Sequence, residues 1–427
     1  MEQIMKKKYA IVILDGASGE PLTELGGLTS LEAAHTPYLD ALAKAGELGL
    51  AKNVPDELEP SSNVACMSIC GLDPSLYPIG RGALEGAALG IDLQPDEVAM
   101  RLNLCNVSDD GIMISYSTDN ISSKDGHALI GEIAAELDNE TFTLHKGAGF
   151  RGILVVKGHL ELMQSEFAAA HNMTDELVAA YPPTGPKAAL ITRYQAMAKK
   201  ILAQSPTNAR RVQAGQMPAT DVFVFWPGMR PAGMQSFKTL YNKDAGMLSG
   251  VDLLNGISRL AGIREYHFAG VTDGPDNDYA AQGEGALAML EQEDVVIIHV
   301  ESPDAEGHDG NALGKKAAIE AIDREIISRL IDYGQKPDVK LRILALPDHP
   351  TPVTRKRHTR ELVPYVLVNV TSELCLPEAN FNVEKPTNQD FQSLEAKKPA
   401  LRLTEAASKA SGIVANPGHQ LMAKLLS

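Results

Sequence analysis

The sequence predicts an α/β fold in which a discontinuous domain, built from both ends of the chain, is interrupted by a smaller α+β domain. Three observations lead to this prediction. Strand and helix patterns alternate towards both ends of the chain. The middle carries short alternating runs separated by polar turns. Acidic and histidine residues follow two runs that are typical of buried strands. We place the discontinuous domain at residues 1–97 and 186–427, and the inserted domain at residues 98–185.

The N-terminal part begins with an apolar strand. Tyr9–Leu14 follows basic residues, but it is too short for the core of a signal peptide or for a membrane span. Ser30–Ala45 has helical periodicity, which Pro37 breaks. Ser61–Cys70 is typical of a turn that leads into a helix, and Gly80–Gly82 predicts a second turn.

The middle of the chain has a different pattern. From about Val98 to Pro183, short runs such as AMRLNLCNV and RGILVVK alternate in polarity, and Ala128–Leu137 is helical. Three or four strands with one helix indicate an α+β insertion. Tyr181–Pro186 is rich in proline and predicts the linker that returns to the first domain.

The remainder returns to alternating helices and strands. Ala188–Gln204 predicts a helix, and Asp221–Trp226 predicts a buried strand that rejoins the first sheet. Residues Ser372–Ala400 are irregular. Further helices are predicted at Gly250–Ala261, Ala280–Glu291 and Asn311–Tyr333, and further strands near Glu265–Gly270 and at Asp294–Val300, Val339–Leu346 and Pro364–Asn369.

Composition narrows the class of protein. With 427 residues, 44% hydrophobic and 22% charged, the chain is long enough for two or three domains with a large core. The net charge of -16 argues against nucleic-acid partners and against binding to an anionic membrane. A phosphorylated substrate is still compatible, because bound metal ions can reverse the local field. Four cysteines are too few to stabilise a chain of this size by disulfide bonds, so we expect reduced, packed thiols and a cytoplasmic location.

Acidic and histidine side chains follow the predicted strands directly. Asp15 ends the first strand, and Asp348-His349 follows Val339–Leu346 at a turn that Pro350 favours. Parallel strands bring such residues to one rim of the sheet, where mixed oxygen and nitrogen donors suit a pair of divalent cations. Asp15 before glycine is also a common turn cap.

A second group follows the strand that ends at Val300. Asp304 and His308 are four residues apart, so both reach one ion if the segment is helical. Glu306 and Asp309 could replace them as ligands. His358 is either a further ligand or a surface histidine among basic neighbours.

Ser62 stands at or near the start of a predicted helix. One interpretation is a capping serine. The other is a nucleophile whose oxygen binds a cation and loses its proton easily, with the helix N-terminus stabilising phosphoryl oxygens. Ser61 competes for either role, and spacing alone does not choose between them.

Taken together, four segments resemble the cofactor-independent phosphoglycerate mutases of the alkaline-phosphatase superfamily, and most closely their archaeal-type branch. The segments are ILDGASGEPLTELGG, SSNVACMSICGLDPSLYPIGRGALEGAALGI, VESPDAEGHDG and LPDHPTPVTRKRHTRELVPYVL, and the resemblance covers nearly the whole chain. It implies an alkaline-phosphatase-like three-layer α/β/α core with an inserted domain.

The resemblance also implies roles for individual residues. Ser62 would be the phosphorylated nucleophile, since Ser61-Ser62-Asn63-Val64-Ala65 matches the Gly-Ser-Asp-Val-Ala motif of the family. Two divalent ions are implied, with manganese favoured over zinc, cobalt or magnesium. The first would be held by Asp15, Ser62, Asp348 and His349, and the second by Asp304, His308 and His358.

The implied reaction moves the phosphoryl group of 3-phosphoglycerate to Ser62 and then to the 2-hydroxyl of glycerate. Closure of the cleft between domains would exclude water. The substrate anion needs cationic partners, for which the candidates are Arg81, Arg101, Lys146 and Arg151; each is otherwise an ordinary solvated charge. His171 would be a proton shuttle, or a loop histidine without a catalytic role.

Three departures from the family pattern concern the substrate. Thr118–Ile121 stands for Ala-Gly-His-Ile, Ala170–Asn172 for Pro-His-Asp, and Leu346–Pro350 for Gly-Asp-His-Ser. None removes a proposed ligand. The Pro-Asp-His-Pro form is similar to a bacterial sub-branch suggested to act as homoserine kinases, although the sequence has no glycine-rich phosphate loop. The same residues are also compatible with a phosphatase or sulfatase and with a non-catalytic metal-binding protein, and the sequence does not reveal the oligomeric state.

Overall fold

The apolar strand near the start of the chain lies at the centre of the larger of two sheets. The computed structural model describes residues 6–77, 79–374 and 401–427. They form two units: Met1–Tyr77 with Gln235–Ser427, and Pro78–Met234. The insertion that we predicted, residues 98–185, lies inside the second unit, which extends further at both ends.

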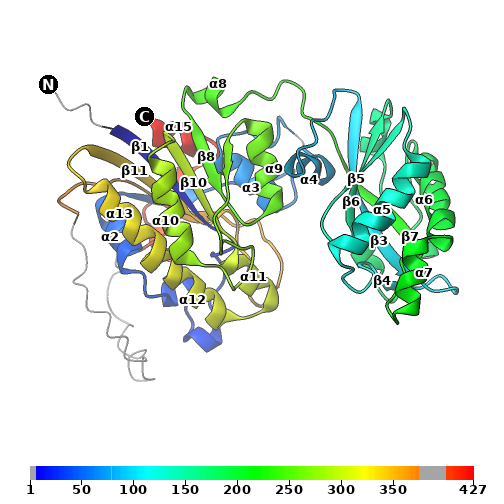
Figure 1. Cartoon of the computed structure of the whole chain (residues 1–427). Helices are drawn as coiled ribbons and strands as arrows, with labels where there is room; N and C mark the ends of the chain where they lie inside the picture. The colour runs from blue at the N-terminus through cyan, green and yellow to red at the C-terminus, as the bar shows by residue number, and fades with distance from the viewer. Residues whose placement is uncertain (1–5, 78, 375–400) are drawn as a thin grey trace. The chain divides into compact units, whose positions relative to one another are not determined.

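The sheet of the first unit has eight strands in the order β13-β2-β12-β11-β1-β10-β8-β9. Strand β1 (Lys6–Leu14) is parallel to both of its neighbours, β10 (Val295–Val300) and β11 (Val339–Leu346) (Figure 1). The other strands of this sheet are β2 (Glu47–Ala51), β8 (Ala245–Leu248), β9 (Arg264–Tyr266), β12 (Val363–Asn369) and β13 (Val414–Ala415). Strands β13 and β9 form the edges of this sheet and β2 and β8 lie next to them; sequence patterning missed β2, β8 and β13.

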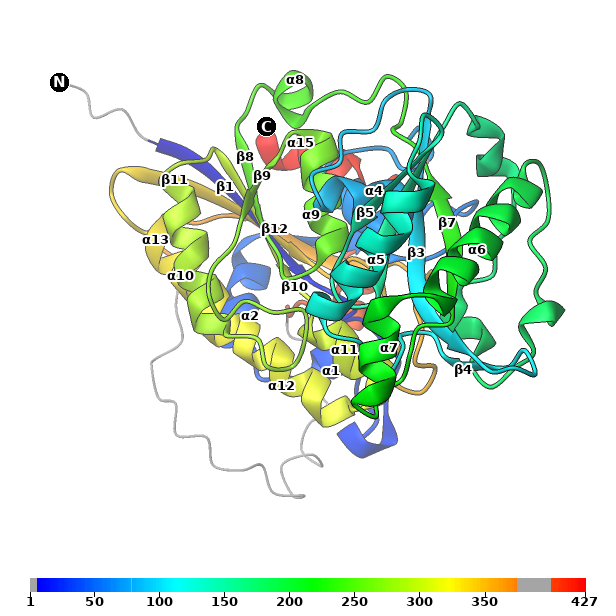
Figure 2. The same ribbon diagram turned by 45° about the vertical axis from the view of Figure 1, so that its right-hand side comes forward.

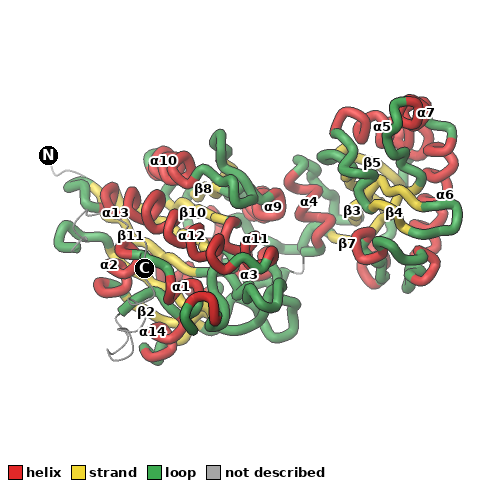
Figure 3. Tube along the Cα trace, turned by 90° about the horizontal axis from the view of Figure 1, so that it is seen from below, coloured by secondary structure: helices red, strands yellow, loops and turns green. Residues whose placement is uncertain are grey.

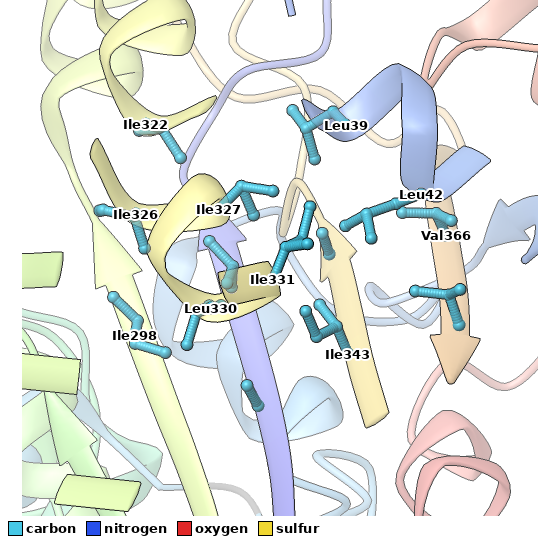
Figure 4. Close-up of a cluster of buried hydrophobic side chains, with 14 of the residues drawn as sticks. Leu39, Leu42, Ile298, Ile322, Ile326, Ile327, Leu330, Ile331, Ile343 and Val366 are labelled. Atoms are coloured by element: carbon cyan, nitrogen blue, oxygen red, sulfur yellow. The ribbon is translucent and has the colours of Figure 1, made fainter. Parts of the chain in front are cut away.

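Helices cover both faces of this sheet, which confirms the three-layer α/β/α core (Figures 1 and 3). On one face, Val12 belongs to an apolar cluster with buried residues of the helices that cover it, and Figure 4 shows this cluster around Ile298, Ile331 and Ile343. On the other face, the hydroxyl of Tyr9 donates to the carbonyl of Leu426, 3.2 Å away. The helices of the first unit are α1 (Ser30–Ala33), α2 (Pro37–Ala45), α3 (Ser62–Ile69), α8 (Phe237–Tyr241), α9 (Asp252–Ala261), α10 (Tyr279–Leu290), α11 (Ser302–Asp309), α12 (Ala312–Ile322), α13 (Ser328–Gly334), α14 (Glu405–Ala410) and α15 (Gln420–Leu426), with the 3-10 turn η1 (Thr23–Leu25) and the π-helical turn η5 (Asp323–Ile327) between α12 and α13.

A buried carboxyl in η5 gives this core a dependence on pH. Asp323 accepts hydrogen bonds from the backbone N–H groups of Leu39 and Tyr38, at 2.6 and 3.2 Å. Burial raises the pKa of Asp323 to about 7, although these N–H groups and nearby Arg402 oppose the shift; Asp40 adds to it. Because the folded protein holds this proton more tightly than the unfolded chain, the contribution of Asp323 to stability is present below pH 4 and is lost as the pH rises through 7.

We therefore expect wild type to lose stability relative to Asp323→Asn between pH 4 and pH 8. The difference amounts to up to about 4 kcal/mol, since one pKa unit corresponds to about 1.4 kcal/mol. Asparagine keeps one acceptor for the start of α2 and does not titrate. Urea unfolding of both proteins across this pH range checks the prediction, and parallel pH profiles would contradict it.

The second unit contains a five-stranded antiparallel sheet. Strand β3 (Glu97–Val107) is central and pairs with β6, β7 and β4, while β6 also pairs with β5. Helices α5, α6 and α7 lie together beside this sheet (Figure 2). The other elements of the unit are β4 (Met113–Ser115), β5 (Phe142–Lys146), β6 (Arg151–Lys157), β7 (Asp221–Gly228), α4 (Arg81–Ala88), α5 (Ser123–Leu137), α6 (Ala188–Ala203), α7 (Pro206–Gln213), η2 (Leu160–Gln164), η3 (Ala170–Met173) and η4 (Val178–Ala180).

The prediction that Asp221–Trp226 rejoins the first sheet was wrong. This strand is β7, which pairs with β3 from Ala99 to Cys105 in the sheet of the second unit. Val222 and Val224 are buried in the core that α5 and α6 share with β3. An alternating apolar run shows that a strand has one buried face, but it carries no information on which sheet the strand joins.

No helix in the described part of the chain is both long and apolar enough to cross a membrane. The predicted helix break at Pro37 is confirmed, since α1 ends at Ala33 and α2 begins at the proline. The prediction of an irregular segment at Ser372–Ala400 falls for the most part outside the described residues.

Candidate two-metal active site

The carboxyl ends of three parallel strands meet at one edge of the large sheet. Leu14 pairs with Val300, and Ile13 pairs with Leu346. The residues that follow these strands therefore emerge side by side: Asp15 after β1, helix α11 after β10, and Asp348 after β11. Open α/β sheets bind ligands at this edge.

The first predicted ligand group gathers around one imidazole nitrogen. The Nε2 atom of His349 lies 3.2 Å from Ser62 Oγ, 3.2 Å from Asp348 Oδ2 and 3.8 Å from Asp15 Oδ1. Asp15, Asp348 and His349 are fully buried at their side chains. Ser62 begins α3, and neither it nor Ser61 makes a side-chain capping bond there. The structure thus favours Ser62 over Ser61, whose hydroxyl faces the carbonyl of Glu59 at 3.4 Å.

The second predicted ligand group surrounds the carboxylate of Asp304. His308 Nε2 lies 3.2 Å from Asp304 Oδ2, and His358 Nε2 lies 3.5 Å from Asp304 Oδ1. The ring of His358 also stacks on that of His349, with centroids 3.9 Å apart, so the two groups adjoin. Glu306 and Asp309 are not needed as replacements: Glu306 instead accepts from Asn311. Of the two interpretations of His358, its contacts with Asp304 and His308 favour the one that places it in the ligand group over a surface histidine among basic neighbours.

The hydrogen bonds of these two histidines direct two imidazole lone pairs toward one carboxylate. Nδ1 of His308 lies 3.0 Å from the carbonyl of Lys356, and Nδ1 of His358 lies 3.3 Å from the carbonyl of Pro60. Since a carbonyl only accepts, each Nδ1 carries hydrogen and each neutral ring presents a lone pair at Nε2. The two Nε2 atoms are 2.9 Å apart beside a carboxylate. Three electron-rich atoms in this arrangement require a positive charge, supplied by a proton or a metal ion.

The pKa values of these groups also show that the site lacks positive charge. His308 has a raised pKa, chiefly because it bonds to Asp304, and His358 has a raised pKa because Asp304 outweighs the effect of burial. Burial, and then the charge of Asp348, raises the pKa of Asp15. Asp15 Oδ1 is buried and has no hydrogen-bond partner among the described residues. A divalent cation fits both groups, because their donors are carboxylate, imidazole and hydroxyl atoms that need charge compensation.

Close packing of the loops holds the two groups together. A Cβ atom at Gly16, where φ is +59°, would stand 2.8 Å from Asp304 Cα and 2.7 Å from Thr351 Oγ1. The Thr351 hydroxyl donates to Asp304, and the Lys315 ammonium donates to the carbonyls of Ser18 and Thr351 at 3.0 and 2.7 Å. Lys315 is fully buried, which lowers its pKa to about 8.

Sequence reasoning missed four residues that adjoin the ligands: His299, Glu301, Lys315 and Thr351. His299 lies inside β10, and its Nε2 is 2.6 Å from Asp15 Oδ2. Glu301 follows β10, and burial raises its pKa to about 7. A histidine in the otherwise apolar run VVIIHV was the one signal that pointed to His299. Lys315 and Thr351 carry no comparable signal, because both look like ordinary helix and loop residues.

A cationic cluster occupies one face of the sheet in the second unit. Glu85 on α4 accepts from Arg81, at 2.9 Å, and from Arg101. His171 stands near both arginines, and burial together with their charges lowers its pKa. These groups hold more positive than negative charge, so the cluster can bind an anion.

The strand register divides the remaining candidates between the two faces. Arg151 pairs with Asn103, two residues from Arg101, so both arginines share a face. Lys146 pairs with Gly152, which pairs with Leu102 in the core beneath α5. Lys146 therefore lies on the opposite face, and the structure does not bring it to the cluster. Because successive side chains of a strand alternate between its two faces, the strand register decides on which face of the sheet each basic residue lies.

Beside a β-bulge, the rings of two consecutive aromatic residues, Phe225 and Trp226, lie near that of His171. The pairing of β3 with β7 shifts between Ala99 and Arg101, and Trp226 adopts a φ of +55°. Its ring lies 5.6 Å from that of His171, while the Arg81 guanidinium lies 4.0 Å from the Trp226 ring centroid. This conformation is costly for a bulky residue, and strained residues of this kind cluster at functional sites.

An α/β sheet that gathers carboxylates, imidazoles and one serine at its carboxyl edge defines a metal-dependent enzyme of the phosphoryl-transfer class. Within that class, the chain belongs to the 2,3-bisphosphoglycerate-independent phosphoglycerate mutase family. It is 35% identical over 400 residues to the mutase of Methanosarcina barkeri, covering 94% of this chain and 97% of that protein. It is 32% identical to a probable mutase of Geobacter sulfurreducens, covering 98% and 99%. The family model matches residues 43–208.

Solved structures show the same fold. A protein of Pyrococcus horikoshii matches with a TM-score of 0.76 at 23% identity, covering 99% of this chain and 97% of that one. The cofactor-independent phosphoglycerate mutase of Thermoplasma acidophilum matches with a TM-score of 0.64 at 21% identity, covering 99% of this chain and all of that one. The fold predicted from the resemblance is confirmed.

Proposed function

We propose that the chain interconverts 3-phosphoglycerate and 2-phosphoglycerate through a phosphoserine at Ser62. The observation that carries this proposal is the position of the Ser62 hydroxyl, 3.2 Å from His349 Nε2 and within the same ligand group as Asp15 and Asp348. The relatives that cover almost the whole chain are named for this mutase activity.

We assign Asp15, Ser62, Asp348 and His349 to one divalent cation, and Asp304, His308 and His358 to the other. When bound, these cations supply Lewis acidity and neutralise the charge of the phosphoryl group. Manganese, zinc and cobalt suit the mixed imidazole and carboxylate donors better than magnesium does. The buried, free thiols of Cys66, Cys70 and Cys105 support a reducing, cytoplasmic setting, and this activity would belong to glycolysis and gluconeogenesis.

The residues of the chain account for the two transfers. Ser62 Oγ gives up its proton and attacks phosphorus, the bond from phosphorus to the 3-oxygen breaks, and the 3-oxygen takes up a proton. The 2-hydroxyl then gives up its proton and attacks the phosphoserine, the bond from phosphorus to Ser62 Oγ breaks, and Ser62 Oγ takes up a proton. We assign the proton transfers to His171, since burial and two nearby arginines lower its pKa and favour the neutral, basic ring. Arg81, Arg101 and Arg151 would hold the substrate anion.

An enolase-coupled assay with 3-phosphoglycerate and manganese tests the proposal. We expect turnover that disappears after exhaustive chelation and returns when manganese is added. Release of free phosphate would instead indicate a hydrolase, and ADP formation that depends on homoserine would indicate a kinase. Either result without mutase turnover would overturn the proposal.

The cationic cluster of the second unit leads to a separate prediction about substrate affinity. Arg81→Ala should raise the KM for 3-phosphoglycerate by about 10–100-fold, because a hydrogen bond to a charged group is worth about 1.5–3 kcal/mol. Glu85 stays paired with Arg101 in this variant, so the fold should survive. Lys146→Ala is the matched control and should leave KM within about two-fold, since Lys146 lies on the opposite face of the sheet. Steady-state kinetics of both variants decides, and equal effects would contradict the assignment.

A further inference from the structure

A buried hydrogen-bonded chain leads from the start of helix α9 to Asp15. The Val251 N–H donates to Ser249 Oγ over 3.0 Å, Ser249 Oγ lies 3.1 Å from His299 Nδ1, and His299 Nε2 lies 2.6 Å from Asp15 Oδ2. Ser249, His299 and Asp15 are each at most 2% exposed. Water therefore does not compete for these bonds.

The direction of each bond follows from the donors present. Asp15 Oδ2 is a carboxylate oxygen and accepts, so the hydrogen of the neutral His299 ring is on Nε2, where it donates to Oδ2. His299 Nδ1 then carries the lone pair and accepts the hydroxyl hydrogen of Ser249, while Ser249 Oγ accepts from the Val251 N–H. The backbone of His299 is held as well, because its carbonyl accepts from Gln282 Nε2 at 2.7 Å.

With the hydrogen bonds in this direction, the two carboxylate oxygens of Asp15 differ in their partners. Oδ2 accepts from His299, whereas Oδ1 has no hydrogen-bond partner among the described residues and lies 3.8 Å from His349 Nε2. We propose that His299 is a positioning residue that fixes the Asp15 side chain, so that Oδ1 alone is presented to the cation beside Ser62. This inference rests on the proposed function, because it assigns a role relative to the same cation group.

His299 also stands within ligand distance of Asp15 and Glu301, so a direct role as a metal ligand is the competing interpretation. The hydrogen bonds argue against it. Nδ1 accepts from Ser249 and Nε2 carries the hydrogen that Asp15 accepts, so neither ring nitrogen keeps a free lone pair. A ligand role would require the bond to Asp15 or the bond to Ser249 to break.

Four variants of the full chain test the positioning role, with Mn²⁺ titrated by calorimetry as the readout. His299→Leu removes the donor and should weaken binding at one of the two cation sites by about 10–100-fold, the usual cost of losing a residue that orients a ligand. His299→Gln should restore binding to within a few-fold, because a glutamine amide can donate to Asp15 and accept from Ser249. Ser249→Ala should fall between them. Ser258→Ala is the matched control: Ser258 is equally buried, but it donates to Leu254 within α9 and should leave binding unchanged.

A second measurement keeps the inference testable if His299→Leu does not fold. In wild type with ¹⁵N-labelled histidine, the long-range ¹H–¹⁵N spectrum should show His299 with hydrogen on Nε2, before and after the diamagnetic cation Zn²⁺ is added. Hydrogen on Nδ1, or unchanged Mn²⁺ affinity in His299→Leu, would overturn the inference. So would a third Mn²⁺ ion that binds to wild type but not to His299→Leu, because His299 would then be a metal ligand itself. Cation binding that depends on His299, in a protein that does not convert 3-phosphoglycerate, would overturn the proposed function alone.

Discussion

Ser62→Ala is expected to lower mutase turnover by at least about four orders of magnitude, as removal of a catalytic nucleophile does in other enzymes. Without the Ser62 hydroxyl there is no acceptor for the phosphoryl group among the ligands around His349. The fold should remain intact, because Ser62 makes no capping bond at the start of α3 and alanine is a better helix former there. The enolase-coupled rate and the circular dichroism spectrum measure the two effects.

Ser61→Ala is the matched control for this prediction. The two serines are adjacent, yet the Ser61 hydroxyl faces the carbonyl of Glu59 while that of Ser62 faces His349. We expect Ser61→Ala to keep turnover within a few-fold of wild type. Mass spectrometry after a brief exposure to 3-phosphoglycerate should find phosphate on Ser62. Comparable turnover in Ser62→Ala, or phosphate on Ser61 instead, would remove the assignment of the nucleophile.

Gly16→Ala is expected to disrupt both cation groups at once. The added methyl group would lie 2.8 Å from the backbone of Asp304, and Gly16 has a φ of +59°, which side chains rarely adopt. The Gly16 N–H also donates to Asp348 Oδ1 at 3.1 Å, so any movement of this loop displaces a proposed ligand. We expect a loss of about 3 kcal/mol or more in the free energy of unfolding, together with much weaker Mn²⁺ binding.

Gly27→Ala separates the backbone strain from the steric clash. Gly27 has a φ of +84°, but a Cβ atom there would meet no described heavy atom within 4 Å. This variant should lose only the cost of the left-handed conformation, about 1–2 kcal/mol, and should bind Mn²⁺ as wild type does. Denaturant unfolding and Mn²⁺ titration of both variants decide. If the two variants behaved alike, the close approach of Gly16 to Asp304 would not be what organises the site.

All seven ligands proposed from the sequence come together in the structure, and the reason is local. Asp15 and Asp348 each follow an apolar strand closely, and parallel strands in one sheet place such residues at the same edge. His358 was harder to predict, because a histidine among basic residues is usually solvated. Its position depends on how the loop after β11 folds back to Asp304.

Predictions that depended on pairing partners did less well. Asp221–Trp226 was correctly predicted as a strand but assigned to the wrong sheet, and Lys146 was grouped with arginines from which the sheet separates it. Both errors have one cause. Periodicity reports the conformation of a segment, whereas the partner strand and its register decide which residues share a face.

The sequence by itself determined the α/β class, the central strands, the order of the ligand-bearing segments and the family resemblance, because these depend on short-range patterns and motifs. Only the tertiary structure decided that Ser62 rather than Ser61 faces His349, that Gly16 must lack a side chain, and that His299 bonds to Asp15. Each of these depends on contacts between residues far apart in the chain, or on which way one side chain turns. Such contacts are set by packing, which no local pattern records.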